Sequence, residues 1–140
     1  MTNWSQLEAE RAFAAATRER RRAALLGRLR RRGATCSLAV YDETRRVGGA
    51  PARGVHDIPL NEVKGTTEPN RAAQFDGEFR PTALTRCRWL RVWDAFHRGV
   101  TLPPISVVRV GDAYAIRDGH HRVSVAKALG ALTIRAVVAA

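Results

Sequence analysis

Cysteine is scarce in this chain of 140 residues: Cys36 and Cys87 are its only two, and they belong to no paired motif. Isolated cysteines exclude a disulfide framework and a zinc ribbon, and they suit a reducing compartment. Long apolar runs are also missing, since no stretch approaches the roughly 20 residues that a membrane span needs. Residues 1–8 contain an acidic residue, Glu8, and no basic one, whereas a secretory signal begins with basic residues. We therefore expect a cytoplasmic protein without membrane insertion.

Lysine and acidic residues are few as well. Of the 24 basic residues only Lys64 and Lys127 are lysines, and 13 acidic residues leave a formal net charge of +11. A surplus of this sign predicts an anionic partner. The surplus is uneven, because residues 1–33 hold nine arginines against three glutamates. This pattern predicts a basic arm followed by a mildly basic body.

The length is that of one globular domain. Glycine and proline gather in residues 44–54, which predicts a linker. We therefore divide the chain into a basic N-terminal arm over residues 1–47, with a helix, a short strand and a linker, and a main domain over residues 48–140.

Two elements are expected in the arm. Residues 5–32 are rich in helix formers, and Ser5 followed by Glu8 is typical of a capping box. The apolar positions of this helix are sparse and predict a single narrow buried stripe. A short strand is expected over residues 36–41.

The main domain has denser signals. Trp89, Val92, Trp93 and Phe96 form one apolar helix face, which we expect to pack against a sheet rather than to stack on bases. Gly111-Asp112 predicts a tight hairpin turn. The expected elements are a strand over 55–60, a loop over 65–80, a helix over 82–98, strands over 105–110 and 113–117, a helix over 123–129 and a strand over 133–138.

The segment with the most chemistry is Asp118-Gly119-His120-His121-Arg122, between an expected strand and an expected helix. The first turn of a helix favours an anion, and glycine allows a close backbone approach. Arg122 and the two histidines can donate to phosphate oxygens, and Asp118 can accept a proton or hold Mg²⁺. The alternative is that Asp118 caps the helix and the other side chains are solvated. We expect no metal centre of the protein's own, because only two other histidines remain.

Residues 54–140 resemble the ParB/sulfiredoxin fold in the order of their elements and in the Gly-x-x-Arg spacing of Gly119 and Arg122. They are also similar to short bacterial ParB-like N-terminal (nuclease-type) domain proteins. The resemblance implies an α+β fold, a small mixed sheet with helices, preceded here by the long basic helix. It also implies nucleotide phosphates at Gly119, His120, His121 and Arg122, since ParB proteins bind CTP and sulfiredoxins bind ATP.

The segment Asp118–Arg122 differs from the corresponding motif of each related family. His120 stands where sulfiredoxin has its nucleophilic cysteine, which excludes sulfiredoxin chemistry. His120 and His121 replace the Glu-Arg of ParB proteins, which leaves CTP or ATP open. Asp118, Gly119, His120 and Arg122 are similar to the Asp-Gly-His-x-Arg of free-serine kinases.

The loop before the central helix provides a second group of candidates. By the same resemblance, Lys64, Thr66 and Arg80 face the nucleotide, and Glu62 is the position of a kinase base. The alternative is an ordinary solvated loop.

The arginines of the arm are expected to bind nucleic acid without reading its sequence. The alternative is a solvated helix that packs on the body or on a second copy through Leu25, Leu26 and Leu29, as in a homodimer. The arginines concerned are Arg18, Arg20, Arg21, Arg22, Arg28, Arg30, Arg31 and Arg32.

The sequence thus predicts a nucleoside triphosphate-binding ParB-like protein, with Mg²⁺ on the nucleotide and DNA on the arm. The resemblance also implies a place in chromosome partitioning. Nucleotide hydrolysis is compatible with this set of residues. Two alternatives stay open: a small-molecule kinase with Asp118 or Glu62 as base, and a non-enzymatic DNA-binding accessory protein.

Overall fold

A computed structural model describes residues 3–29, 37–42 and 54–139. It has the α+β class predicted from the sequence, with a six-stranded mixed sheet and a long N-terminal helix. The helices are α1 (Asn3–Leu29), α2 (Pro69–Ala72), α3 (Arg86–His97) and α4 (His120–Ala128), with 3₁₀ turns η2 (Leu60–Glu62) and η3 (Ala83–Thr85). The strands are β1 (Ala39–Val40), β2 (Val55–Pro59), β3 (Val63–Thr66), β4 (Ile105–Val110), β5 (Ala113–Asp118) and β6 (Thr133–Ala139).

The strands lie in the order β1-β3-β5-β4-β6-β2. Parallel pairs join β1 to β3, β3 to β5 and β4 to β6, whereas β4 with β5 and β2 with β6 are antiparallel. The predicted β4–β5 hairpin is confirmed: Val110 pairs with Ala113, and Gly111 has the positive φ of 60° that its turn needs. The sheet therefore places the end of β5 beside β3 and β4.

The prediction of a loop over residues 65–80 was wrong in part, because Pro69–Ala72 form α2 and because Gly65 and Thr66 lie in β3. This strand is short and contains glycine, so its sequence alone is a weak strand signal. Gly65 is required by the neighbouring strand, since a Cβ there would lie 2.3 Å from the carbonyl oxygen of Ala39. The strand expected over 36–41 is described only as β1. Cys36 and most of the expected linker lie outside the described residues, and the division at residues 47/48 stays a prediction.

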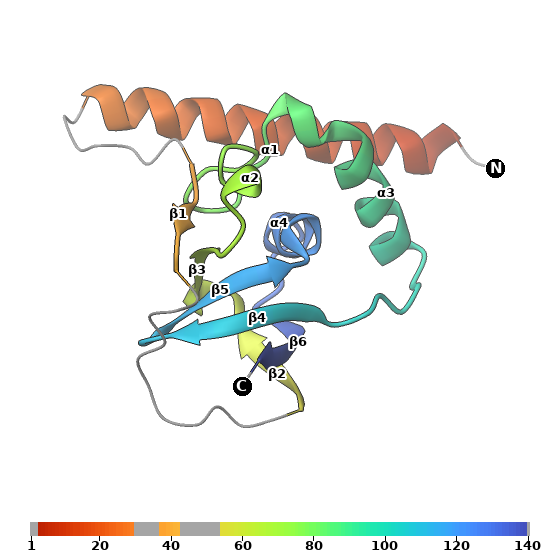
Figure 1. The fold of residues 1–140 in the computed structure, drawn as a ribbon. Helices are drawn as coiled ribbons and strands as arrows, with labels where there is room; N and C mark the ends of the chain where they lie inside the picture. The colour runs from red at the N-terminus through yellow and green to blue at the C-terminus, as the bar shows by residue number, and fades with distance from the viewer. Residues whose placement is uncertain (1–2, 30–36, 43–53, 140) are drawn as a thin grey trace.

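Figure 1 shows α4 between the sheet and α1, which runs across the opposite side of the molecule. One apolar cluster joins α4 to the sheet through residues such as Val123, Ile105 and Ile116. A second cluster joins α1, α3 and α4 through Ala9, Phe13, Trp89, Trp93 and Val125. The tryptophan face is thus core, as predicted, but its main partners are helices rather than the sheet.

The ends of two helices differ from the prediction. α1 begins at Asn3, so Ser5 lies inside the helix, and its hydroxyl donates to Asp94 of α3 at 3.1 Å instead of capping. α4 begins at His120, so both histidines and Arg122 belong to its first turn. Among the helices described, none is long and apolar enough to cross a membrane.

Candidate functional site

The first candidate site is the N-terminus of α4. Gly119 has a φ of 116°, and a Cβ on it would lie 2.4 Å from Cγ2 of Ile105. Only glycine therefore fits between β5 and α4 at this point. The backbone N–H groups of the first turn have no partner inside the helix, so this end is suited to an anion.

His120 connects α4 with β3 and β5 through the hydroxyl of Thr66. Its Nε2 lies 2.6 Å from the hydroxyl oxygen of Thr66. That hydroxyl donates to the Ile116 carbonyl at 3.1 Å and accepts the Glu68 N–H at 2.9 Å. The arrangement is fully satisfied when His120 is protonated on Nε2 and donates to Thr66. Thr66 is buried, so its hydroxyl orients His120 and does not face solvent.

The two histidines share an aromatic neighbour and a positive environment. Phe75 stacks on the His120 ring at 6.3 Å and meets the His121 ring edge-on at 5.3 Å between centroids. Burial and then Arg71 lower the pKa of His120 to about 4, although Asp118 opposes this. Burial, Arg88, Arg71 and His120 lower the pKa of His121 to about 4. Both rings are therefore neutral at pH 7.

Arg122 forms hydrogen bonds with other groups of the protein. Its guanidinium donates to the carbonyls of Pro103 and Pro104, the latter at 3.1 Å, and lies 3.2 Å from the carboxylate of Asp118. The Arg122 side chain is 15% exposed, whereas that of Asp118 is 84% exposed. Arg122 thus fastens the segment before β4 to the start of α4. Contact between this arginine and a phosphate stays a prediction.

Lys64 and Arg80 lie apart from this turn. They line a cavity of about 930 Å³ between α1, η2, the 78–81 segment and the C-terminal half of α4. None of residues 118–122 lines it. Glu62 is half-buried in η2 and is not among the lining residues either. The structure therefore separates the predicted phosphate ligands into two places.

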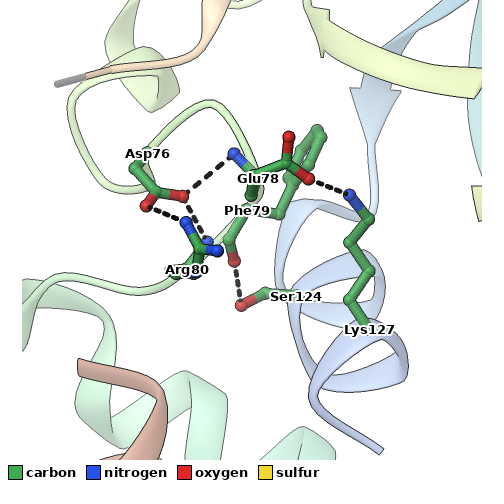
Figure 2. Close-up of polar contacts among 6 residues, drawn as sticks. All are labelled: Asp76, Glu78, Phe79, Arg80, Ser124 and Lys127. Atoms are coloured by element: carbon green, nitrogen blue, oxygen red, sulfur yellow. Dashed lines mark hydrogen bonds and ion pairs between the residues drawn. The ribbon is translucent and has the colours of Figure 1, made fainter. Parts of the chain in front are cut away.

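A tight loop over residues 76–80 forms one wall of the cavity, and Figure 2 shows its contacts. The Asp76 carboxylate accepts the backbone N–H groups of Glu78 and Arg80 at 3.0 and 2.8 Å and the Arg80 side chain at 3.2 Å. Phe79 has a φ of 62°, and its carbonyl accepts the hydroxyl of Ser124 at 2.6 Å. Trp89 donates to that hydroxyl in turn, so α3 and α4 hold this wall in place.

The arginines of the arm lie on α1. Of the eight arginines predicted to bind nucleic acid, four are exposed on α1, whereas Arg20 is half-buried and its Nε is buried without a hydrogen-bond partner in the described structure. The exposed ones are Arg18, Arg21, Arg22 and Arg28. Arg30, Arg31 and Arg32 lie outside the described residues. Leu25, Leu26 and Leu29 are exposed, so they do not dock α1 on the body.

Sequence reasoning missed two residues of the first site. Arg71 lies in α2 and Arg88 in α3, and their charges lower the pKa of His121. No signal in the sequence distinguishes them, because arginine is abundant along the whole chain. Within the described ranges, no three His, Cys, Asp or Glu side chains gather as a metal site.

Comparisons with known proteins identify a likeness in structure. No protein-family model matches the chain, and no curated protein matches it. Among solved structures, the chain is similar to sulfiredoxin from Arabidopsis thaliana, with 21% identity over 61% of this chain and 84% of that chain and a TM-score of 0.44. A likeness at this level assigns neither an activity nor a ligand.

Proposed function

We propose that this chain binds a nucleoside triphosphate, with the phosphates at the N-terminus of α4 and between Arg71 and Arg88. One observation carries the proposal: two adjacent histidines begin α4, and the charges of both arginines act on His121. Positive charge and a helix N-terminus converge there, and the exposed Asp118 opposes the lowering of the His120 pKa. A phosphate group would compensate this excess.

The sequence resemblance to nucleotide-binding ParB-like proteins supports the same position. CTP and ATP are the nucleotides that it implies. Asp118 is the carboxylate next to this turn, and with the phosphates it would hold the Mg²⁺ that neutralises their charge. Hydrolysis or phosphoryl transfer would then depend on how the phosphates are positioned.

Arg122 has a positioning role in this proposal. Its contacts with the Pro103 and Pro104 carbonyls shape the turn, so Arg122→Ala removes structure together with any phosphate contact. Arg88 is a cleaner test, because it is exposed on α3 and acts on His121 through its charge.

The experiment is calorimetric titration of the full chain with CTP, ATP, ADP and GTP in the presence of Mg²⁺. We expect saturable binding of one triphosphate, at least tenfold weaker in Arg88→Ala. Arg135→Ala is the matched control, since Arg135 is exposed on β6 and acts on neither histidine. Absence of binding, or equal weakening in both variants, would contradict the proposal. Phosphate release measured with and without serine then separates hydrolysis from a kinase reaction.

We also propose a second function, DNA association through α1. It rests on four exposed arginines of α1, a helix that buries Ala9 and Phe13 against the rest of the protein. The backbone of nucleic acid is the polyanion that such a row of charges fits.

A further inference from the structure

The cavity under α1 is separate from the site proposed above. Its lining comes from α1, from η2 and β3, from the 78–81 segment, and from the end of α4 with the turn that follows. A volume of about 930 Å³ is within the usual range for small-molecule sites. Whatever it binds is therefore expected to bind independently of a nucleotide at the start of α4.

The cavity exists because α1 presents small side chains at this place. Ala12, Ala15 and Ala16 face it, where a helix that fills a core presents leucine or phenylalanine. The opposite side offers larger apolar groups, including Leu60, Phe79 and Leu132. The body of a ligand between these walls would be apolar.

The polar groups at the cavity favour an anion. The ammonium group of Lys64 is exposed and has no ion pair within the described part of the chain. Arg80 gives one nitrogen to Asp76 and keeps others free of that carboxylate. Lys127 lies 3.4 Å from Glu78 and 5.5 Å from the centre of the Phe79 ring. Arg80 is paired with Asp76 and Lys127 with Glu78, so among the described residues Lys64 is the lining cation without an ion pair, and Glu19 is the other lining carboxylate.

The wall at Phe79 is held in an unfavourable conformation. A φ of 62° is rare for an aromatic residue, and the Asp76 loop and the Ser124 hydroxyl maintain it. Strain of this kind gathers at functional sites, because it fixes a surface before a ligand arrives. The ring is buried, so it supplies a rigid base to the cavity.

From this arrangement we infer that the cavity binds a small aromatic carboxylate. The ring system would lie between the alanines of α1 and Leu60, and the carboxylate would accept from Lys64 and Arg80. α1 is a wall of this site as well as a nucleic-acid surface, so the ligand would also stabilise the docking of α1.

The test is calorimetric titration of the full chain with 2-naphthoate, and with 2-naphthylmethanol as its neutral counterpart. We expect one-to-one binding of 2-naphthoate, with the alcohol at least tenfold weaker. Ala15→Leu fills the cavity and should weaken 2-naphthoate at least tenfold. Ala14→Leu is the matched control, because Ala14 is an exposed neighbour on α1 that does not line the cavity.

Three results would overturn this inference: no binding of 2-naphthoate up to millimolar concentration, equal binding of the alcohol, or equal weakening in the two leucine variants. Thermal unfolding of each variant establishes that it is folded. Arg88→Ala should leave 2-naphthoate binding unchanged, and this separates a failure here from a failure of the nucleotide site.

Discussion

Neighbouring residues at the start of α4 have sharply different environments. His120 and His121 are buried against Phe75, Arg122 holds two backbone carbonyls, and Asp118 extends into solvent. Four polar residues within five positions therefore provide two neutral rings, one structural cation and one accessible carboxylate. Their chemistry is set by what packs on them and not by residue type alone.

The buried histidines make stability depend on pH. Their pKa is about 4 in the folded chain and 6.5 in the ordinary state, so between these values the unfolded chain binds more protons. Stability is therefore complete above pH 6.5 and falls as the pH drops toward 4. We expect His121→Phe to reduce the slope of unfolding free energy against pH by up to about 1.4 kcal/mol per pH unit. Urea unfolding at a series of pH values measures it.

As the pH falls from 6.5 toward 4, the free energy of unfolding of His121→Phe should decrease less steeply than that of the wild-type chain, so the difference between the two curves changes through this window. Parallel curves through this window would show that His121 is not buried as a neutral ring. His120→Gln provides a second measurement, because the amide keeps a donor for Thr66 while removing the titration.

The sequence predicted which residues at this turn have a special role, but it did not predict their contacts. Gly119 was expected to admit a ligand, and the structure gives it a steric reason, Ile105. The partners of Arg122 are carbonyls 18 and 19 positions earlier in the chain. Such contacts leave no local pattern, because they depend on how β4 and α4 meet.

At the scale of the element, packing accounts for the docking of α1 more than charge does. The Phe13 ring meets Trp89 edge-on at 5.4 Å, beside Trp93. The ion pair of Glu10 with Arg86 and the contact of Glu8 with His97 join α1 to α3, and both are partly or largely exposed. Pairs of this kind contribute about 0–1 kcal/mol each.

Phe13→Ala is therefore expected to destabilise the chain by about 3–5 kcal/mol, the usual cost of removing a buried phenylalanine. Urea unfolding followed by circular dichroism measures the change. Leu25→Ala on the same helix is the control, because Leu25 is 58% exposed and its loss should cost little. Similar effects of the two substitutions would mean that α1 is not docked through Phe13.

Elements with a strong period or a clear turn were predictable, and elements defined by their neighbours were not. The tryptophan period predicted α3, and Gly111-Asp112 predicted the hairpin. β3 is a strand because β1 and β5 pair with it on either side. The predicted capping box at Ser5 was wrong, because α1 begins earlier and the Ser5 hydroxyl donates to Asp94 instead.

At the scale of the whole molecule, the net charge of +11 is unevenly displayed. α1 runs along one side of the protein (Figure 1) and packs its apolar face on α3 and α4. Arg18, Arg21, Arg22 and Arg28 on this helix are exposed. The composition predicted the sign of the partner, whereas the direction of the charges follows from the packing of Phe13. This arrangement permits a direct test of the nucleic-acid surface.

DNA binding through α1 should appear in its salt dependence. Each phosphate contact contributes about −0.9 to the slope of log affinity against log salt concentration, so removing four contacts should flatten the slope by about 3–4. Fluorescence anisotropy of a labelled duplex measures it in a variant with glutamine, which preserves the helix, at Arg18, Arg21, Arg22 and Arg28. The matched control removes the same charge from the body, at Arg91, Arg98, Arg109 and Arg135. If both variants flatten the slope equally, the net charge of the molecule attracts DNA and α1 is not its surface.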